Sequence, residues 1–169
     1  MTPEGAEGES IDVSLTNGEV FDGKDEPETL ELHRAIYQKN KKVNAIVHSQ
    51  KPDIIRASKM RKKLLPYLDD FAQIAGINLR TARFSPSNQL ESGGQIAKAL
   101  KRRSAVLLED NGALCVGSSI DEARAVETVT DKNAAVSVAK DLFDKVKTIG
   151  LVDAALMRVV YVLKYSKKK

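Results

Sequence analysis

Two short apolar segments joined by a turn constrain the fold of this chain more than any other feature. Residues 104–108 and 113–116 are almost wholly apolar, and the Asp-Asn-Gly run at 110–112 suits a tight turn, because Asn and Gly tolerate positive φ. A third apolar segment, residues 43–48, ends in a histidine. Short apolar runs bounded by turn residues are typical of buried strands. We therefore expect a hairpin and a third buried strand that carries His48 at its end.

Helical patterns fill most of the remaining chain. Leu32 and Ile36 share one helix face, and Ser119 is an N-cap residue followed closely by two acids. We expect helices over residues 28–40, 52–63, 68–75, 91–103, 120–148 and 151–165, and further strands over 11–15, 20–21 and 77–84. Strands and helices mix without strict alternation, which favours a mainly antiparallel or mixed sheet between helices. The length suits a single domain over residues 1–169, with flexible ends at 1–10 and 166–169.

Composition and charge argue against several function classes. The net charge of +4 owes much to the three lysines at 167–169, and aromatic residues make up only 5% of the chain. A nucleic-acid surface needs a basic face, ideally with stacking aromatics, so no nucleic-acid partner is expected. No apolar run approaches the roughly 18–20 residues of a membrane span. The first 20 residues are acidic and lack a signal-peptide core, which predicts a cytoplasmic location, and the single Cys115 excludes an intramolecular disulfide.

Three sequence blocks together resemble the class II aldolase/adducin family. They are residues 30–37, which include His33; His48, fifteen residues further on; and residues 107–117, followed by 119–123. The resemblance implies an α/β fold of three layers with a central, mainly antiparallel or mixed sheet. It also implies that the family's N-terminal helix and strand are missing here. Family members usually form tetramers with the active site near a subunit interface, so a homo-oligomer is expected.

The resemblance also implies where a zinc site would lie. Active members of the family end the strand in His-x-His and carry a third histidine before the hairpin glycine, and these three hold zinc. Here His48 is retained at the first position, whereas Gln50 and Asn111 occupy the other two. An amide offers a neutral oxygen, which is a poor Zn²⁺ ligand compared with imidazole or thiolate. We therefore expect no cofactor, and zinc only if the site is functional.

The positions that handle protons and phosphate in the family are altered as well. The catalytic acid position corresponds to Thr29, which cannot act as a base near neutral pH, and a one-residue shift would make Glu28 the candidate. The first phosphate turn corresponds to Glu4 and Gly5, with glutamate in place of a hydroxyl residue. The paired serines of the family correspond to Pro27 and Glu28. Carboxylates at these positions would repel a phosphate dianion.

Two main functions remain open. Simultaneous change of two ligands, the acid and the phosphate positions favours a catalytically degenerate family member, which serves as a binding or oligomeric scaffold for an unidentified small molecule. The alternative is an active metal-dependent aldehyde-lyase or epimerase with a reorganised site, acting on a sugar-phosphate-like substrate. It would use His48 as a base, or a metal completed by Glu28 or Asp110. In a third interpretation, a partner supplies the missing N-terminal segment. Without the resemblance, His48 is simply a hydrogen-bonded strand-end histidine and Asn111 a turn residue.

Overall fold

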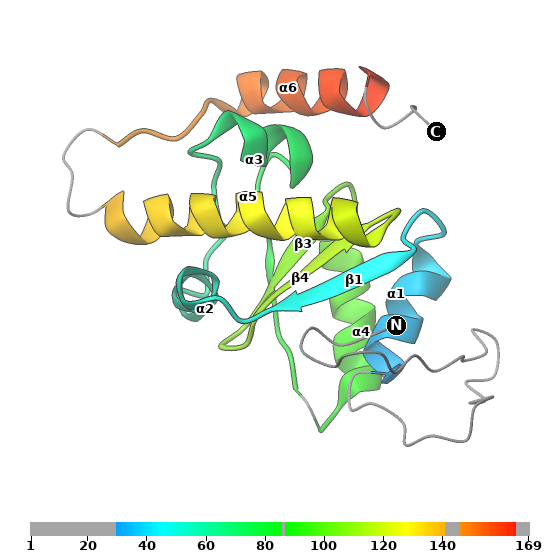
Figure 1. The fold of residues 1–169 in the computed structure, drawn as a ribbon. Helices are drawn as coiled ribbons and strands as arrows, with labels where there is room; N and C mark the ends of the chain where they lie inside the picture. The colour runs from blue at the N-terminus through cyan, green and yellow to red at the C-terminus, as the bar shows by residue number, and fades with distance from the viewer. Residues whose placement is uncertain (1–29, 86, 141–145, 165–169) are drawn as a thin grey trace.

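The computed structural model describes residues 30–85, 87–140 and 146–164 (Figure 1). Its elements in chain order are α1 (Leu30–Lys39), β1 (Ala45–Ser49), α2 (Pro52–Lys59), α3 (Asp69–Ile74), β2 (Thr81–Ala82), α4 (Gln89–Ala99), β3 (Ala105–Leu108), β4 (Gly112–Gly117), α5 (Ile120–Ala139) and α6 (Leu151–Lys164). The strands expected over 11–15 and 20–21 lie outside the described residues.

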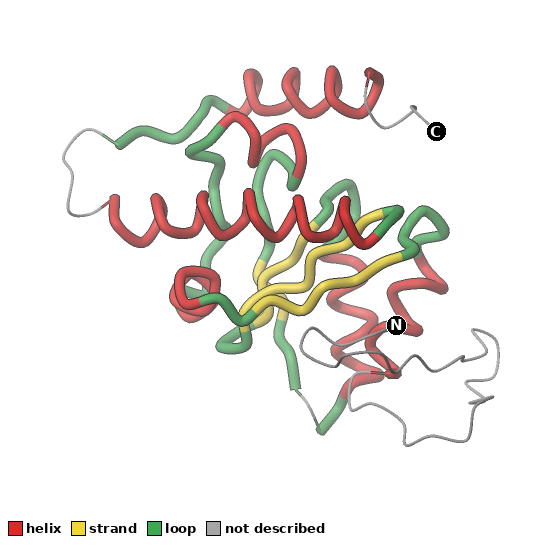
Figure 2. The backbone as a smooth tube through the Cα atoms, viewed as in Figure 1, coloured by secondary structure: helices red, strands yellow, loops and turns green. Residues whose placement is uncertain are grey.

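Among the described residues, four strands form one mixed sheet in the order β1-β4-β3-β2. The central strand β4 runs antiparallel to both β1 and β3, and β2 runs parallel to β3 at the edge. Figure 2 shows the strands as one twisted layer with helices on either side. The hairpin, the third strand that carries His48 and the mainly antiparallel or mixed sheet are all confirmed.

Successive strand residues enter two separate cores on the two faces of the sheet. Neighbours along a strand point to opposite faces, so Val47 packs in the core with α2, α3 and α5, whereas Ile46 packs in the core with α1 and α4. On the first face Phe71 of α3 is fully buried, and on the second face Leu32 of α1 is. Helix α6 lies beyond α3, away from the sheet (Figure 1). The three-layer α/β fold is therefore present.

The observed elements differ from the expected ones mainly at their ends. Helix α2 stops earlier than predicted, at Lys59, because Arg61 adopts a φ of 53°, outside the right-handed helical region. The strand predicted over 77–84 was too long: it is reduced to the two residues of β2, preceded by an isolated bridge between Leu64 and Leu79.

The long helix predicted over 120–148 is present as α5, Ile120–Ala139. Part of the remainder, 141–145, lies outside the described residues, and residues 146–150 have no regular structure, so the predicted end was too late. The start of α5 agrees with the prediction, because the Ser119 hydroxyl oxygen accepts a hydrogen bond from the Glu122 N–H at 3.2 Å. None of the helices in the described segments combines the length and apolar character that a bilayer crossing requires.

The close approach of the hairpin to the end of β1 requires glycine at position 112. Gly112 has a φ of +84°, and a Cβ there would lie 2.1 Å from the main-chain oxygen of Ser49. No side chain fits at that distance, and most residues avoid this backbone conformation. The strand β1 can therefore run alongside the turn only because residue 112 has no side chain.

Replacing Gly112 with alanine should lower the free energy of unfolding by about 2–4 kcal/mol, through backbone strain and the clash with Ser49. Urea denaturation followed by circular dichroism measures the loss. Gly94→Ala in α4 is the matched control, because a Cβ there would meet only Lys39 Nζ, at 3.6 Å. That variant should keep or slightly raise the stability, since alanine is the better helix former. Equal stability of the two variants would contradict the role given to Gly112.

Candidate functional site

His48, Gln50 and Asn111 lie together at one end of the sheet. The register of β1 on β4 sets His48 opposite Leu114, which brings Gln50 beside the hairpin turn. The Nε2–H group of His48 donates a hydrogen bond to the main-chain oxygen of Asn111 at 3.0 Å, and Gln50 Nε2 donates to Asn111 Oδ1 at 3.5 Å. The three positions singled out in the sequence are thus neighbours in space.

The donor set at these positions does not suit zinc. The Nε2 atom of His48 is engaged with a carbonyl oxygen, and Gln50 and Asn111 offer amides, which are weak ligands for Zn²⁺. Within the described ranges, no group of three or more His, Cys, Asp or Glu side chains is placed to hold a metal ion. The residues that meet here therefore do not fit a resident zinc ion.

A buried carboxylate anchors the strand that carries these residues. Ser49 Oγ donates a hydrogen bond to Glu127 Oε1 at 2.5 Å, and Lys51 Nζ lies 3.7 Å from Glu127 Oε2. Glu127 is only 4% exposed. Burial of a carboxylate is tolerated when hydrogen bonds and a nearby cation replace its hydration. Since His48 and Gln50 flank Ser49, this contact with α5 fixes the backbone from which both side chains project.

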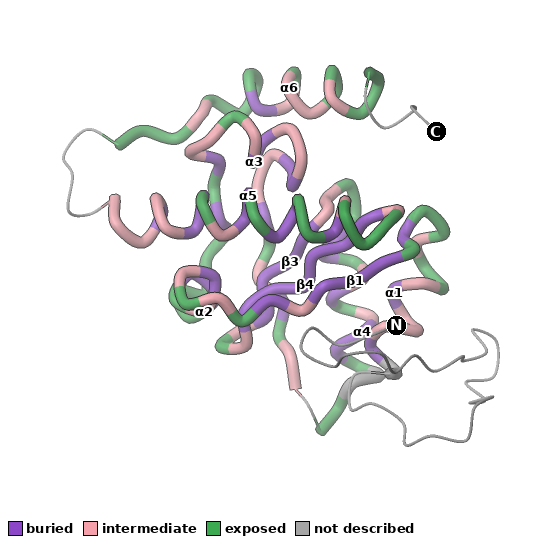
Figure 3. Tube along the Cα trace, viewed as in Figure 1, coloured by how far each residue is buried: buried purple, intermediate pink, exposed green. Residues whose placement is uncertain are grey.

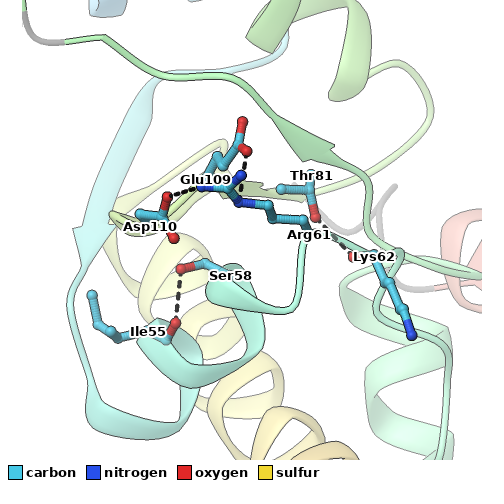
Figure 4. A network of polar contacts seen from close by, with 7 residues as sticks. All are labelled: Ile55, Ser58, Arg61, Lys62, Thr81, Glu109 and Asp110. Atoms are coloured by element: carbon cyan, nitrogen blue, oxygen red, sulfur yellow. Dashed lines mark hydrogen bonds and ion pairs between the residues drawn. The ribbon is translucent and has the colours of Figure 1, made fainter.

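An arginine holds the hairpin turn (Figure 4). Arg61 contacts Glu109 through Nε and Asp110 through a terminal guanidinium nitrogen, each at 2.8 Å. The hydrogen bond to Asp110 and the charges of both carboxylates raise the pKa of the Arg61 guanidinium. From α2, the Ser58 hydroxyl accepts a hydrogen bond from the Gly112 N–H at 3.3 Å. The Arg61 side chain is exposed, so these ion pairs orient the turn more than they stabilise the fold.

A second histidine, His33 of α1, is half-buried and lies close enough to His48 for their charges to interact. Its Nε2 atom has no hydrogen-bond partner among the described residues. Burial, and to a smaller extent the charge of His48, lowers the pKa of His33 to about 4, so its imidazole is neutral at pH 7. On another side, the ring of Phe84 meets the His48 ring edge-on, with centroids 6.2 Å apart. His48 thus has a neutral imidazole and an aromatic ring as neighbours.

A hollow of about 520 Å³ opens beside this cluster. Phe84 lines the hollow and also contacts His48, so the two share a wall. Amide and hydroxyl side chains form much of its lining, and its charged residues are Arg61, Arg83, Glu91, Glu109 and Asp110. Three carboxylates against two arginines would disfavour a phosphate dianion. The hydroxyls, amides and aromatic ring suit a neutral, polyhydroxylated molecule better.

The remaining predicted site residues lie outside the described residues, and their roles stay predictions: Glu4, Gly5, Pro27, Glu28 and Thr29. Among the residues that sequence reasoning missed, Glu127 carries a usable signal. It lies four residues after Ala123 and three before Thr130, both buried, so a carboxylate interrupts the buried face of α5. Arg61 and Phe84 come from irregular segments and carry no comparable signal.

The comparison with known families settles the kinship of the chain. Residues 6–138 match the family described as the class II aldolase and adducin N-terminal domain, which is well over half of the sequence. The chain belongs to the class II aldolase and adducin family. The resemblance drawn from the three sequence blocks is thereby confirmed.

The relatives of this family member that match it in sequence are named aldolases. An L-fuculose phosphate aldolase of Methanococcus maripaludis is 29% identical over 126 residues, which are 75% of this chain and 68% of the relative. A 5-deoxy-D-ribulose 1-phosphate aldolase of Bacillus thuringiensis is 26% identical over 119 residues, which are 70% of this chain and 55% of the relative. The chain thus spans only part of the length of either relative.

Solved structures confirm the fold class. An L-fuculose 1-phosphate aldolase superposes with a TM-score of 0.82, covering 89% of this chain and 71% of that one at 22% identity. An L-fuculose-1-phosphate aldolase from Thermus thermophilus gives 0.66, covering 80% of this chain and 71% of that one at 21% identity. Likeness at these identities establishes a shared fold and no shared activity.

Stability should fall as the pH drops from about 6.5 toward 4, because native His33 resists protonation. A histidine in the unfolded chain titrates near 6.5 and native His33 at about 4. In this window the unfolded state binds more protons, so the free energy of unfolding rises with pH. The stabilising contribution of His33 is fully present above pH 6.5. Its complete loss lowers the free energy of unfolding by about 3 kcal/mol.

Urea denaturation at pH 7 and pH 4.5 measures this effect. His33→Gln removes the titrating group and should flatten the pH dependence in this window. His48→Gln is the control, because it retains His33 and should keep most of the slope. Identical slopes in the natural protein and in His33→Gln would show that His33 is not the group responsible.

Proposed function

We propose that this chain is a catalytically degenerate member of the class II aldolase and adducin family that serves as a binding or oligomeric scaffold. The observation that carries the proposal is the hydrogen bond from His48 Nε2 to the Asn111 main-chain oxygen, with the Gln50 amide directed at the Asn111 side chain. Groups at all three ligand positions bond to one another. They form a hydrogen-bonded polar cluster at the end of the sheet, and they leave no strong donor set for a metal.

The hollow beside the cluster supports a binding role. The charge of Arg61 in its lining is compensated, because Arg61 is paired with both Glu109 and Asp110. A neutral molecule with several hydroxyl groups can use the amides and hydroxyls of the lining and stack on Phe84. The scaffold would act as a homo-oligomer, a tetramer if it follows the rest of the family.

The alternative function is a metal-dependent aldehyde-lyase or epimerase with a reorganised site. The names of the sequence relatives favour it, since all are called aldolases. A metal at this site would have to break the bond from His48 to Asn111 and recruit a carboxylate. Asp110 is the carboxylate at the turn, and it is already bound by Arg61 at 2.8 Å. The free-energy cost of breaking the His48–Asn111 hydrogen bond and the Arg61–Asp110 ion pair favours the degenerate function.

Zinc uptake distinguishes the two functions. After incubation with one equivalent of zinc and desalting, the natural protein should retain less than about a tenth of an ion per chain, because one imidazole and two amides bind zinc weakly. The double variant Gln50→His/Asn111→His should retain about one ion per chain, since it supplies three imidazoles at one place. Elemental analysis by mass spectrometry measures both.

Two controls sharpen this experiment. His48→Ala in the double-variant background should abolish the gained zinc, which places the ion at this cluster. L-fuculose 1-phosphate, which appears in the name of a structural relative, serves as the activity probe. The natural protein should not cleave it above the uncatalysed rate. Near-stoichiometric zinc in the natural protein, or zinc-dependent cleavage, would overturn the proposal in favour of the enzyme.

A further inference from the structure

The outermost helix, α6, turns a row of large apolar side chains to solvent. The exposed fractions are 80% for Val152, 63% for Leu156, 52% for Val159 and 60% for Leu163. Figure 3 shows exposed turns along the side of α6 that faces away from α3. Single exposed apolar residues are common on soluble proteins, whereas a continuous row marks an interaction surface. We call these four residues the α6 row.

The opposite side of α6 attaches the helix to the body. Ala154 is fully buried there. The Arg158 guanidinium donates hydrogen bonds to the main-chain oxygens of Gln73 and Ile74 at the end of α3, both at 2.6 Å, and to Ser104 Oγ at 2.9 Å. These bonds satisfy carbonyl groups that a helix C-terminus leaves open. The rotation of α6 is therefore fixed, and the α6 row cannot turn inward without losing them.

The spacing of the α6 row identifies the shape of its partner. Its members, Val152, Leu156, Val159 and Leu163, are separated by four, three and four residues. This is the spacing of a coiled-coil seam, and Leu151, Val160 and Val162, exposed by 65%, 50% and 40%, widen the apolar face on either side of it. A helix of 14 residues is about 21 Å long, so the row runs along most of α6. The surface fits another α-helix.

We propose that two copies of this chain associate through α6, packed antiparallel about a two-fold axis. An isologous contact needs a self-complementary surface, and the α6 row meets its own copy when Leu156 faces Val159 and Val152 faces Leu163. Charge supports the antiparallel direction. Asp153 near the start and Lys164 at the end lie on the same flank of α6, so each acid meets a lysine of the other copy. The contact deepens the oligomeric part of the proposed scaffold function.

Sedimentation equilibrium of the full chain tests the association. The natural protein should form dimers or larger even-numbered assemblies, and Leu156→Glu should raise the dissociation constant at least about 100-fold, because it sets two like charges at the centre of the contact. Leu156 is largely exposed, so the folded chain tolerates the change, which circular dichroism verifies. Met60→Glu is the matched control: Met60 is 37% exposed and follows α2, which Figure 1 places away from α6. A monomeric natural protein, or equal association of both variants, would overturn the inference.

Cross-linking tests the direction. Val152→Cys and Leu163→Cys are treated with a short bis-maleimide, separately and after subunit exchange in a mixture. The antiparallel contact predicts covalent dimers in the mixture alone, and the native Cys115 adds no background because it is buried. Cross-linking of each variant to itself would show a parallel pair and overturn the arrangement. Zinc uptake by the natural protein would instead overturn the degenerate function and leave these results unchanged, so the two failures are distinguishable.

Discussion

The contact between the end of β1 and the β3–β4 hairpin is the constraint on which the rest of the structure depends. The main-chain oxygen of Ser49 occupies the space that a side chain on Gly112 would fill, and His48 bonds across the same junction to Asn111. The hydroxyl of Ser49 then reaches Glu127 on α5. One short stretch of β1 therefore joins the hairpin and a covering helix. The pairing of β1 with β4, the contact of β1 with α5 and the geometry of the candidate site all meet at this junction.

The groups that fix this junction are separate from the side chains at the three candidate ligand positions. The groups that hold the backbone in place are Gly112, Ser49 and Glu127, and none of them is a ligand position. Gln50 is exposed and Asn111 is half-buried, so their side chains add little to either core. Exchange of imidazole for amide at these two positions costs the fold little free energy and removes the donors that zinc prefers. A shared fold at this junction therefore does not by itself imply shared catalysis.

Much of the fold was predictable because its signals are local. The apolar runs around the turn at 110–112 predict the hairpin, and Ser119 predicts the start of α5. The length of β2 was not predictable from the sequence. It depends on pairing with the partner strand β3 and on the path of the chain toward α4, and neither of these is a local signal. The left-handed Arg61 also escaped prediction, since few arginines adopt that conformation and its contacts to the turn come from distant residues. The sequence predicts a helix over 151–165, and only the structure shows that many of its large apolar side chains point outward.

Helix α6 adds to the molecule without completing its core. Helices α2, α3 and α5 cover one face of the sheet, and α1 and α4 cover the other, so no apolar strand face remains for α6 to bury. What α6 contributes inward is Arg158, which links the end of α3 to Ser104, directly before β3. The other end of β3 leads into the turn that Arg61 holds beside the hollow. Helix α6 and the turn beside the hollow are thus fastened to opposite ends of β3. In the proposed scaffold, this strand holds the α6 row and the hollow at a fixed separation.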